Sequence, residues 1–196
     1  MEFKDLELVF TDNSILCMPG EPSVRFFKND SIDVVMMDWE APLMKRHAEV
    51  VCRKPNSDVL EIGFGMGIFA DFVQKLRPKS HTIVECHPQI LEKMKGWVKG
   101  WNNVRIIEGE WYDVKDQFEI YDGIFYDAHN DNAMLKTAEL KNYIKPGGVF
   151  TYYNEEVGPR NLSFKDIEYE VIDVESFIEE CKYFKGNKYY LPIVNF

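Results

Sequence analysis

Closely spaced cysteines are missing from this 196-residue chain. Its four cysteines are scattered, at Cys17, Cys52, Cys86 and Cys181, and its four histidines show no spacing typical of metal ligands. Structural zinc sites and disulfide frameworks both require such residues at short, regular intervals. We therefore expect no metal site and no disulfide framework, and we expect the reducing environment of the cytoplasm.

Long apolar runs and an excess of positive charge are missing as well. No segment approaches the roughly 20 consecutive apolar residues of a membrane-spanning helix, and the first residues lack the apolar stretch of a signal peptide. Lys and Arg number 23 against 33 Asp and Glu, which gives a net charge of −10. Because negative charge repels a phosphate backbone, we expect neither a nucleic-acid partner nor a membrane. A cationic substrate is favoured instead.

The length and composition suit one folded domain. Of the 196 residues, 45% are apolar, which is ordinary for a globular protein with a sizeable core. No internal repeat or low-complexity linker divides the chain, so a single domain is expected over residues 1–196. Residues 1–30 are expected to form an N-terminal appendage, in which 6–10 and 15–18 pair as a β-hairpin across the polar residues 11–14.

The segment 32–51 is predicted to be helical in part. Apolar side chains recur there with the spacing of one helix face, at Trp39, Leu43, Ala48 and Val51. Pro42 is compatible with a helix only in its first turn or at a kink. A break is therefore expected near residues 40–42.

From residue 58 onward, strand and helix patterns alternate. Apolar runs predict strands at 58–64, 81–87, 104–111, 121–128 and 148–154, with helical periodicity between them at 66–76, 88–101 and 134–144. Such alternation implies right-handed crossovers and a parallel sheet covered on both faces. The β-rich segments 164–174 and 188–196 are expected to form an antiparallel edge. The predicted class is α/β: a doubly wound, mostly parallel sheet with an antiparallel C-terminal edge and a small N-terminal β/α appendage.

The stretch EIGFGMGIF, residues 61–69, follows the first of these strands with glycine at alternate positions, Gly63, Gly65 and Gly67. In a doubly wound sheet the ligand binds beyond the carboxyl ends of the strands, which is where this loop falls. Glycine allows a tight turn and a close approach of the backbone to a ligand, and the following helix offers its N-terminal amides. Alone, the pattern fits a generic strand-to-helix turn equally well.

The neighbours of the loop distinguish between ligands. A dinucleotide fingerprint requires glycine at its sixth position, where this chain has Ile68. Glu85 ends the next predicted strand, where a carboxylate can accept two hydrogen bonds from a ribose diol. Glu61, two residues before the loop, would repel a phosphate and attract an ammonium or sulfonium group. Together these residues indicate S-adenosylmethionine as the cofactor, bound by Glu61, the glycine loop and Glu85.

Several blocks of the chain resemble the class I S-adenosylmethionine-dependent methyltransferases. More narrowly, they resemble guanidinoacetate N-methyltransferase and the related δ-N arginine methyltransferases. The blocks are MMDWEAPLM, VLEIGFGMG, VEC, YDGIFYDA, KPGGVFTYYN and KYYLPI, in this order from Met36 to the C-terminus. The resemblance, which leaves out the first 30 residues, implies a Rossmann-like fold and methyl transfer to a guanidino nitrogen.

The resemblance also implies which residues hold the cofactor. The methionine end would lie over the glycine loop and the ribose at Glu85. Met44 and Trp111 correspond to contacts in the cofactor pocket, as does Trp39 of the Trp-Glu pair. Since tryptophan is more commonly a core residue, a purely structural role for Trp39 and Trp111 is the alternative.

By the same resemblance, Glu40 and Asp127 would face the substrate guanidinium. A guanidinium is a planar fork of donors that a carboxylate engages through two hydrogen bonds, so two carboxylates can orient one nitrogen toward the methyl group. Such positioning can lower the activation barrier of the reaction by roughly 7–11 kcal/mol. A carboxylate must also accept the proton that the nitrogen loses; we assign this base role to Asp127 and the clamp role to Glu40. The local alternatives are a helix cap for Asp127 and a turn hydrogen bond for Glu40.

At three positions expected near the substrate, this sequence differs from the guanidinoacetate enzymes. Glu155 and Glu156 stand where those enzymes have a neutral polar segment for the substrate carboxylate, and His129 stands where an aromatic residue follows their Tyr-Asp pair. Each acidic side chain would repel that carboxylate by about 1 kcal/mol or more. The expected acceptor is therefore peptidyl arginine or a small guanidine such as agmatine, rather than guanidinoacetate. If both glutamates are only solvated charges, this argument does not apply.

Other functions fit parts of the same pattern. A methyltransferase could act on another small amine or on a hydroxyl group. The chain could also be a non-catalytic accessory protein that binds S-adenosylmethionine. A nicotinamide oxidoreductase is disfavoured by Ile68. The oligomeric state is left open by the sequence.

Overall fold

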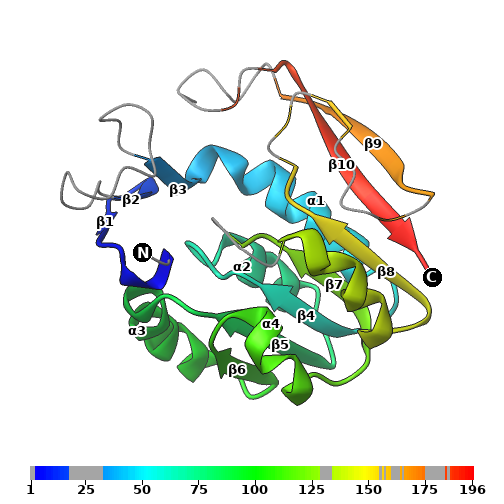
Figure 1. Ribbon diagram of the computed structural model, residues 1–196, viewed down its shortest axis with the longest axis horizontal. Helices are drawn as coiled ribbons and strands as arrows, with labels where there is room; N and C mark the ends of the chain where they lie inside the picture. Colours follow the sequence, from blue (N-terminus) through cyan, green and yellow to red (C-terminus); the bar gives the residue numbers. More distant parts are fainter. Residues whose placement is uncertain are drawn as a thin grey trace.

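A computed structural model describes residues 3–17, 33–128, 134–154, 156, 158–159, 164, 166–174, 184 and 186–196. These residues form a seven-stranded sheet flanked by helices and a separate three-stranded sheet from the N-terminal part of the chain (Figure 1). Within these ranges, every helix is too short or too polar to cross a membrane.

The large sheet has the strand order β6-β5-β4-β7-β8-β10-β9. Its strands are β4 Asp58–Ile62, β5 Ser80–Glu85, β6 Val104–Glu108, β7 Tyr121–Tyr126, β8 Ile144–Tyr152, β9 Glu168–Asp173 and β10 Lys188–Asn195. The pairs from β6 to β8 are parallel, whereas β10 is antiparallel to both β8 and β9. The predicted α/β class, the parallel sheet and its antiparallel C-terminal edge are thus confirmed.

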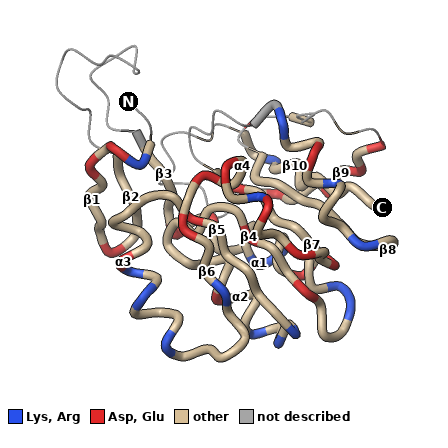
Figure 2. Tube along the Cα trace, turned by 60° about the horizontal axis from the view of Figure 1, so that its bottom comes forward, with Lys and Arg blue, Asp and Glu red and all other residues tan. Residues whose placement is uncertain are grey.

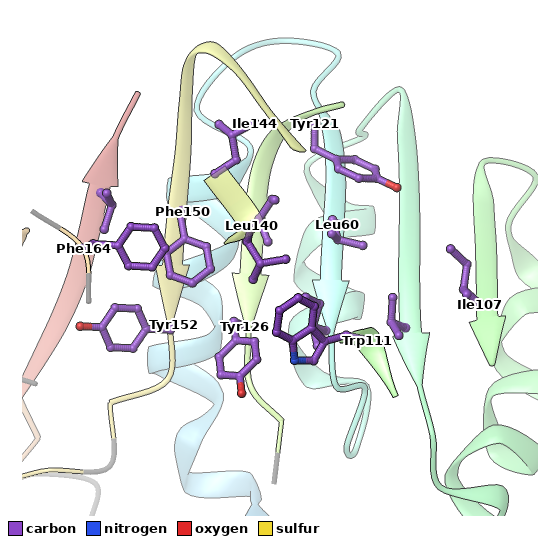
Figure 3. Close-up of a cluster of buried hydrophobic side chains, with 14 residues drawn as sticks. Leu60, Ile107, Trp111, Tyr121, Tyr126, Leu140, Ile144, Phe150, Tyr152 and Phe164 are labelled. Atoms are coloured by element: carbon purple, nitrogen blue, oxygen red, sulfur yellow. The ribbon is translucent and has the colours of Figure 1, made fainter. Parts of the chain in front are cut away.

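Helical segments cover both faces of this sheet. The described helical segments are the α-helices α1 Ala41–Val51, α2 Ile68–Lys75, α3 Pro88–Trp97 and α4 Trp111–Val114, and the 3-10 segments η1 Phe3–Asp5, η2 Asp38–Glu40, η3 Val98–Gly100, η4 Lys115–Gln117 and η5 Met134–Tyr143. Successive side chains of a strand point to opposite faces, so Val59 packs with α1 and α2 while Leu60 packs with α4 and η5. Figure 3 shows the second of these clusters, where Leu60, Leu140 and Trp111 lie close together.

The N-terminal sheet consists of β1 Leu8–Phe10, β2 Ser14–Cys17 and β3 Asp33–Met37. All of its pairs are antiparallel. The predicted hairpin is confirmed, with Leu8 opposite Cys17 and Phe10 opposite Ile15. Residues 18–32, which include the rest of the expected appendage, lie outside the described part of the chain.

Residues 33–37 form a strand, so the segment 32–51 is helical only in its second half. They are extended because their backbone pairs with β2, a segment that is distant in the sequence. The helix α1 begins only at Ala41, with Pro42 in its first turn, as expected. The predicted break near residues 40–42 is the change from η2 to α1.

Two other predicted boundaries are shifted. The strand predicted at 104–111 ends at Glu108, and Trp111 instead opens the short helix α4. This turn buries the Trp111 ring in the hydrophobic cluster of Figure 3. The helix predicted at 134–144 is the 3-10 segment η5, and β8 already begins at Ile144.

The N-terminal sheet is tied to the start of α3. Gln89 binds both backbone groups of Leu8: its Oε1 accepts from the Leu8 N–H at 2.8 Å, and its Nε2 donates to the Leu8 carbonyl at 3.1 Å. His87 Nε2 donates to the Leu6 carbonyl at 2.9 Å. Because His87 lies two residues after Glu85, the last residue of β5, these bonds hold β1 close to the carboxyl ends of the parallel strands.

Candidate active site

The carboxyl ends of β4, β5 and β7 meet at the centre of the large sheet. Strand β4 pairs with β5 on one side and with β7 on the other, and a doubly wound sheet binds its ligand at such a switch point. Gly63, Glu85 and Asp127 lie at these three strand ends. Backbone hydrogen bonds hold them there: the Gly63 N–H donates to the Val84 carbonyl at 2.9 Å, and the Asp127 N–H donates to the Ile62 carbonyl at 2.8 Å.

Two glycines of the loop are required by their neighbours within the protein. Gly63 and Gly65 have φ values of +90° and +54°, a region that residues with a side chain rarely adopt. A Cβ atom at Gly63 would fall on the carbonyl oxygen of Asp127, and one at Gly65 would lie 2.7 Å from Sδ of Met36. The loop therefore packs directly against the end of β7 and against β3.

Met36 was not predicted as a site residue, yet it contacts the glycine loop. Its Sδ accepts a hydrogen bond from the Met66 N–H at 3.3 Å, and its side chain is buried. Gly67 follows as the residue that caps α2, and its N–H donates to the Phe64 carbonyl at 2.8 Å. A signal for Met36 was present in the sequence, because it opens the MMDWEAPLM block that also contains Glu40.

Glu85 lies at the end of β5, as predicted, and is only 4% exposed. Its Oε2 accepts from the Phe64 N–H at 3.0 Å, and its Oε1 accepts from the N–H groups of Cys86 and His87, both at 2.8 Å. Burial raises the pKa of Glu85, and these amide hydrogen bonds partly oppose the shift. Because a carboxylate can accept about four hydrogen bonds, Glu85 shapes the loop and still has capacity for a hydroxyl donor.

Glu61 is fully buried in β4, beneath the loop. Its Oε2 lies 2.8 Å from His81 Nε2 without the angle of a hydrogen bond, and neither carboxylate oxygen has a hydrogen-bond partner among the described residues. Gln74 Nε2 donates to His81 Nδ1 at 3.1 Å, which leaves the ring proton on Nε2, facing Glu61. Burial raises the pKa of Glu61 well above its ordinary value, with the charges of Asp127 and Glu85 adding to the shift, and burial lowers that of His81 to about 3. A contact between Glu61 and a cofactor stays a prediction.

Trp39 and Glu40 lie in the 3-10 turn that joins β3 to α1. Glu40 is 3% exposed, and its Oε1 accepts from the Met37 N–H at 2.9 Å. This is the turn hydrogen bond that the sequence left open, and it holds the carboxylate in one orientation. The Trp39 ring packs 5.9 Å from the Phe184 ring, in a cluster that also contains Tyr189.

The two carboxylates predicted to face the substrate both affect the pKa of Tyr189. Burial raises the pKa of Tyr189 well above its ordinary value, and the negative charges of Asp127 and Glu40 add to this shift. The two carboxylates come from different elements, the end of β7 and η2. Asp127 is partly exposed whereas Glu40 is buried. Their catalytic roles stay predictions.

Met44 and Trp111 lie in hydrophobic clusters on opposite faces of the sheet. Met44 is fully buried on α1 and belongs to the same cluster as Met36. The Trp111 ring is also buried, 6.4 Å from the ring of Tyr126 (Figure 3). Both positions fit a core role, and their predicted contacts with the cofactor stay predictions.

Of the three residues expected at the acceptor, only Glu156 is in the described part of the chain. His129 and Glu155 lie outside it. Glu156 is exposed, and its N–H donates to Oδ1 of Asn154 at 3.3 Å. An exposed carboxylate at this place is compatible with a substrate contact and with a solvated charge.

Acidic residues lie at the carboxyl ends of the parallel strands, whereas the charges at the opposite end are paired with one another. Figure 2 shows acidic residues gathered between β5 and α4, and the charge of Glu110 contributes to the raised pKa of Glu85. At the opposite end of the strands, Lys145 pairs with Asp58 at 2.6 Å and with Asp122 at 2.7 Å. Negative charge at the carboxyl ends favours a cationic ligand there.

Comparison with known proteins relates the chain to arginine and guanidinoacetate methyltransferases. Residues 31–162, more than half of the chain, match the model of a family described as guanidinoacetate N-methyltransferase. A curated relative from Candida glabrata, named protein arginine N-methyltransferase 2, is 40% identical over 166 residues, which cover 77% of this chain and 40% of that protein. The protein of the same name from Saccharomyces cerevisiae is 36% identical over 179 residues, which cover 80% of this chain and 43% of that protein. The chain thus spans about two fifths of the length of these relatives.

Solved structures share the fold at low sequence identity. Spermidine synthase from Thermotoga maritima has a TM-score of 0.65 and 13% identity, covering 96% of this chain and 72% of that chain. Precorrin-6y C5,15-methyltransferase from Geobacter metallireducens has a TM-score of 0.59 and 13% identity, covering 82% and 89%. These similarities support the Rossmann-like fold alone. By its sequence match over residues 31–162, the chain belongs to the guanidinoacetate N-methyltransferase family.

Proposed function

We propose that the chain is an S-adenosylmethionine-dependent methyltransferase that transfers a methyl group to a guanidino nitrogen. Its family membership and its identity of 36–40% to proteins named arginine N-methyltransferase support this function. The observation in the fold that carries the proposal is the position of Asp127 at the end of β7, where its N–H donates to the Ile62 carbonyl at 2.8 Å, directly before the glycine loop. Asp127 also packs against Gly63 of the loop.

The residues around the loop fit the methyl donor. Glu85 has acceptor capacity for a ribose hydroxyl beyond its three amide hydrogen bonds. Glu61, whose carboxyl group has no hydrogen-bond partner in the described part of the chain and whose pKa is raised by burial, would be ionised more readily beside a cation than beside a phosphate. When bound, the donor supplies an electrophilic methyl group on a positively charged sulfur.

Glu40 and Asp127 supply what the acceptor requires. Glu40, whose carboxylate is held by the Met37 N–H, is the clamp that binds the guanidinium fork and orients one nitrogen. Asp127, which is partly exposed, is the base. It accepts the proton that the nitrogen loses as the new bond to the methyl carbon forms and the carbon–sulfur bond breaks. The products are a methylated guanidine and the demethylated donor.

The acceptor is a guanidine that has no carboxylate close to its reacting nitrogen, such as peptidyl arginine or agmatine. Glu155 and the exposed Glu156 follow the end of β8, and their charges would repel the carboxylate of guanidinoacetate. The names of the relatives at 36–40% identity favour protein arginine.

Incubation with isotopically labelled S-adenosylmethionine and a panel of acceptors tests this proposal. The panel contains an arginine-rich peptide, free arginine, agmatine and guanidinoacetate, and mass analysis locates the label. We expect label on a guanidino nitrogen of the peptide or of agmatine, with guanidinoacetate the poorest acceptor. Label on an amine or hydroxyl group would show a different methyltransferase. Binding of the donor without transfer to any guanidine would show a non-catalytic protein.

A further inference from the structure

A buried chain of hydrogen bonds links α1, β8 and β10 beside the candidate active site. His47 Nδ1 lies 2.7 Å from Thr151 Oγ1, and His47 Nε2 lies 2.9 Å from the hydroxyl of Tyr189. Thr151 Oγ1 is also 2.6 Å from the Pro192 carbonyl. The Tyr189 hydroxyl accepts from the Asn154 N–H at 2.9 Å. The side chains that take part are all fully buried: His47, Thr151, Tyr189 and Asn154.

The donors and acceptors in this series of hydrogen bonds determine where each proton lies. The Pro192 carbonyl can only accept, so the Thr151 hydroxyl donates to it and accepts from His47 Nδ1–H. His47 Nε2 is then left to accept the proton of the Tyr189 hydroxyl, whose oxygen accepts the Asn154 N–H. Both rings are therefore neutral. Burial has the same effect, because it lowers the pKa of His47 to about 3 and raises that of Tyr189.

Asn154 connects this chain to the segment expected at the acceptor. Its Nδ2 donates to the Gly158 carbonyl at 2.8 Å and to the Tyr190 carbonyl at 3.0 Å. Its Oδ1 accepts from the Glu156 N–H at 3.3 Å. The buried side chain of Asn154 therefore holds the backbone groups of Glu156 and Gly158, while its own backbone N–H donates to the Tyr189 hydroxyl.

The same segment adjoins the proposed base. The Tyr153 N–H donates to the Tyr126 carbonyl at 3.0 Å, directly before Asp127. The rings of Tyr153 and Tyr189 lie 5.8 Å apart. A displacement of the Tyr189 hydroxyl would therefore move the backbone that lies beside Asp127.

We propose that Tyr189 is a positioning residue that sets the affinity for the guanidine acceptor. This inference rests on the proposed function. Held by His47 and Thr151, it acts through Asn154, because its hydroxyl accepts from the Asn154 N–H directly after Tyr153, which is bonded to the end of β7. The glycine loop and Glu85 belong to the ends of β4 and β5, on the other side of β7 in the sheet. Loss of the hydroxyl should therefore weaken acceptor binding and spare donor binding.

The variant Tyr189→Phe tests this role. It leaves His47 Nε2 without a donor and the Asn154 N–H without its acceptor. We expect KM for the guanidine acceptor to rise about tenfold while kcat changes by less than about twofold. The Kd of S-adenosylhomocysteine, measured by calorimetry, should equal that of the wild type. The matched control is Tyr121→Phe, because Tyr121 is equally buried and its hydroxyl accepts from the Glu119 N–H at the opposite end of β7, at 3.2 Å.

Two variants of His47 separate positioning from general packing. His47→Gln places an acceptor near the position of Nε2, which faces Tyr189, whereas His47→Asn places a donor near the position of Nδ1, which faces Thr151. The acceptor KM should stay closer to the wild-type value with Gln than with Asn. Equal effects of both variants, or a donor Kd that rises together with the acceptor KM, would show a merely structural role and overturn the inference.

Amide hydrogen-exchange rates test the role of Tyr189 without depending on catalytic turnover. Tyr189→Phe should speed exchange at the amides of Asn154 and Glu156 and leave the amide of Gly63 unchanged. Unchanged exchange at Asn154 would overturn the inference. If the wild type methylates no guanidine, the proposed function has failed, and the exchange rates then decide by themselves whether Tyr189 holds this segment.

Discussion

The carbonyl oxygen of Asp127 occupies the space that a Cβ atom at Gly63 would need. The Asp127 N–H donates to the carbonyl of Ile62, the residue directly before this glycine, at 2.8 Å. The residue proposed as the base and the loop proposed to hold the donor are therefore joined through the backbone. Their separation is determined by the pairing of β4 with β7 rather than by a mobile side chain.

Gly63→Ala tests this junction. The positive φ alone should cost about 1–3 kcal/mol of the free energy of unfolding, and the overlap with the Asp127 carbonyl should displace the end of β7. We expect a lower unfolding midpoint in urea and weaker binding of S-adenosylhomocysteine. Gly96→Ala is the control, since a Cβ at Gly96 in α3 meets nothing within 4 Å. That control should raise the free energy of unfolding by about 0.5–1 kcal/mol. Equal stability of the two variants would contradict the close contact.

Glu85→Gln should weaken both the fold and the donor site. An amide nitrogen cannot accept, so at least one of the backbone N–H groups that now bind the carboxylate loses its acceptor. We expect losses of about 1–3 kcal/mol in the free energy of unfolding and in donor binding by calorimetry. Glu92→Gln, on the exposed side of α3, is the control and should change neither quantity. Donor affinity that is unchanged in Glu85→Gln would refute the ribose assignment.

Glu40→Gln and Asp127→Asn should separate chemistry from donor binding. Removing a base or clamp is expected to lower kcat/KM by about 10²–10⁴-fold. The Kd of S-adenosylhomocysteine should change little, because neither side chain belongs to the glycine loop. Asp38→Asn provides the control, since Asp38 lies in the same turn as Glu40 but is exposed. Full activity of either carboxylate variant would exclude that residue from its proposed role.

Acid should destabilise the protein through its buried histidines. Burial lowers the pKa of His47 and of His81 to about 3, against about 6.5 in the unfolded chain. Between these values the unfolded state binds more protons, so stability falls as pH falls from about 6.5 toward 3, by up to about 1.4 kcal/mol per pH unit for each histidine. Urea unfolding at pH 7, 6 and 5 measures this slope. It should be smaller for His47→Gln than for the wild type, and identical slopes would show that His47 titrates normally when folded.

Charge reversal after β8 tests the choice of acceptor. The double variant Glu155→Lys with Glu156→Lys should increase the methylation of guanidinoacetate relative to that of agmatine. Two positive charges would attract the substrate carboxylate instead of repelling it. Competition between the two acceptors, read by mass analysis, measures the ratio. Glu92→Lys on α3 controls for the change in net charge. A ratio that does not move would identify the two glutamates as surface charge.

Much of the fold followed from local patterns in the chain. The alternation of strand and helix periodicity from residue 58 onward predicted the parallel sheet, because apolar spacing reports directly which faces of an element are buried. The carboxyl ends of neighbouring parallel strands must meet at one edge, so the same pattern predicted that the glycine loop and Glu85 bind one ligand, whereas Asp127 was assigned from the family resemblance. The strand at 33–37 was missed because its hydrogen-bond partner is β2, and local spacing did not reveal that pairing.

The sequence by itself determined the class of fold, the place of the glycine loop and the family, since each depends on short patterns or on blocks of residues that are adjacent in the chain. Only the tertiary structure decided which side chains close around the site. Met36 lies 30 residues before Met66, whose amide it binds, and His47 lies 142 residues before Tyr189. Such contacts form when distant elements pack together. Because they depend on the three-dimensional path of the backbone, no periodicity or motif spacing encodes them.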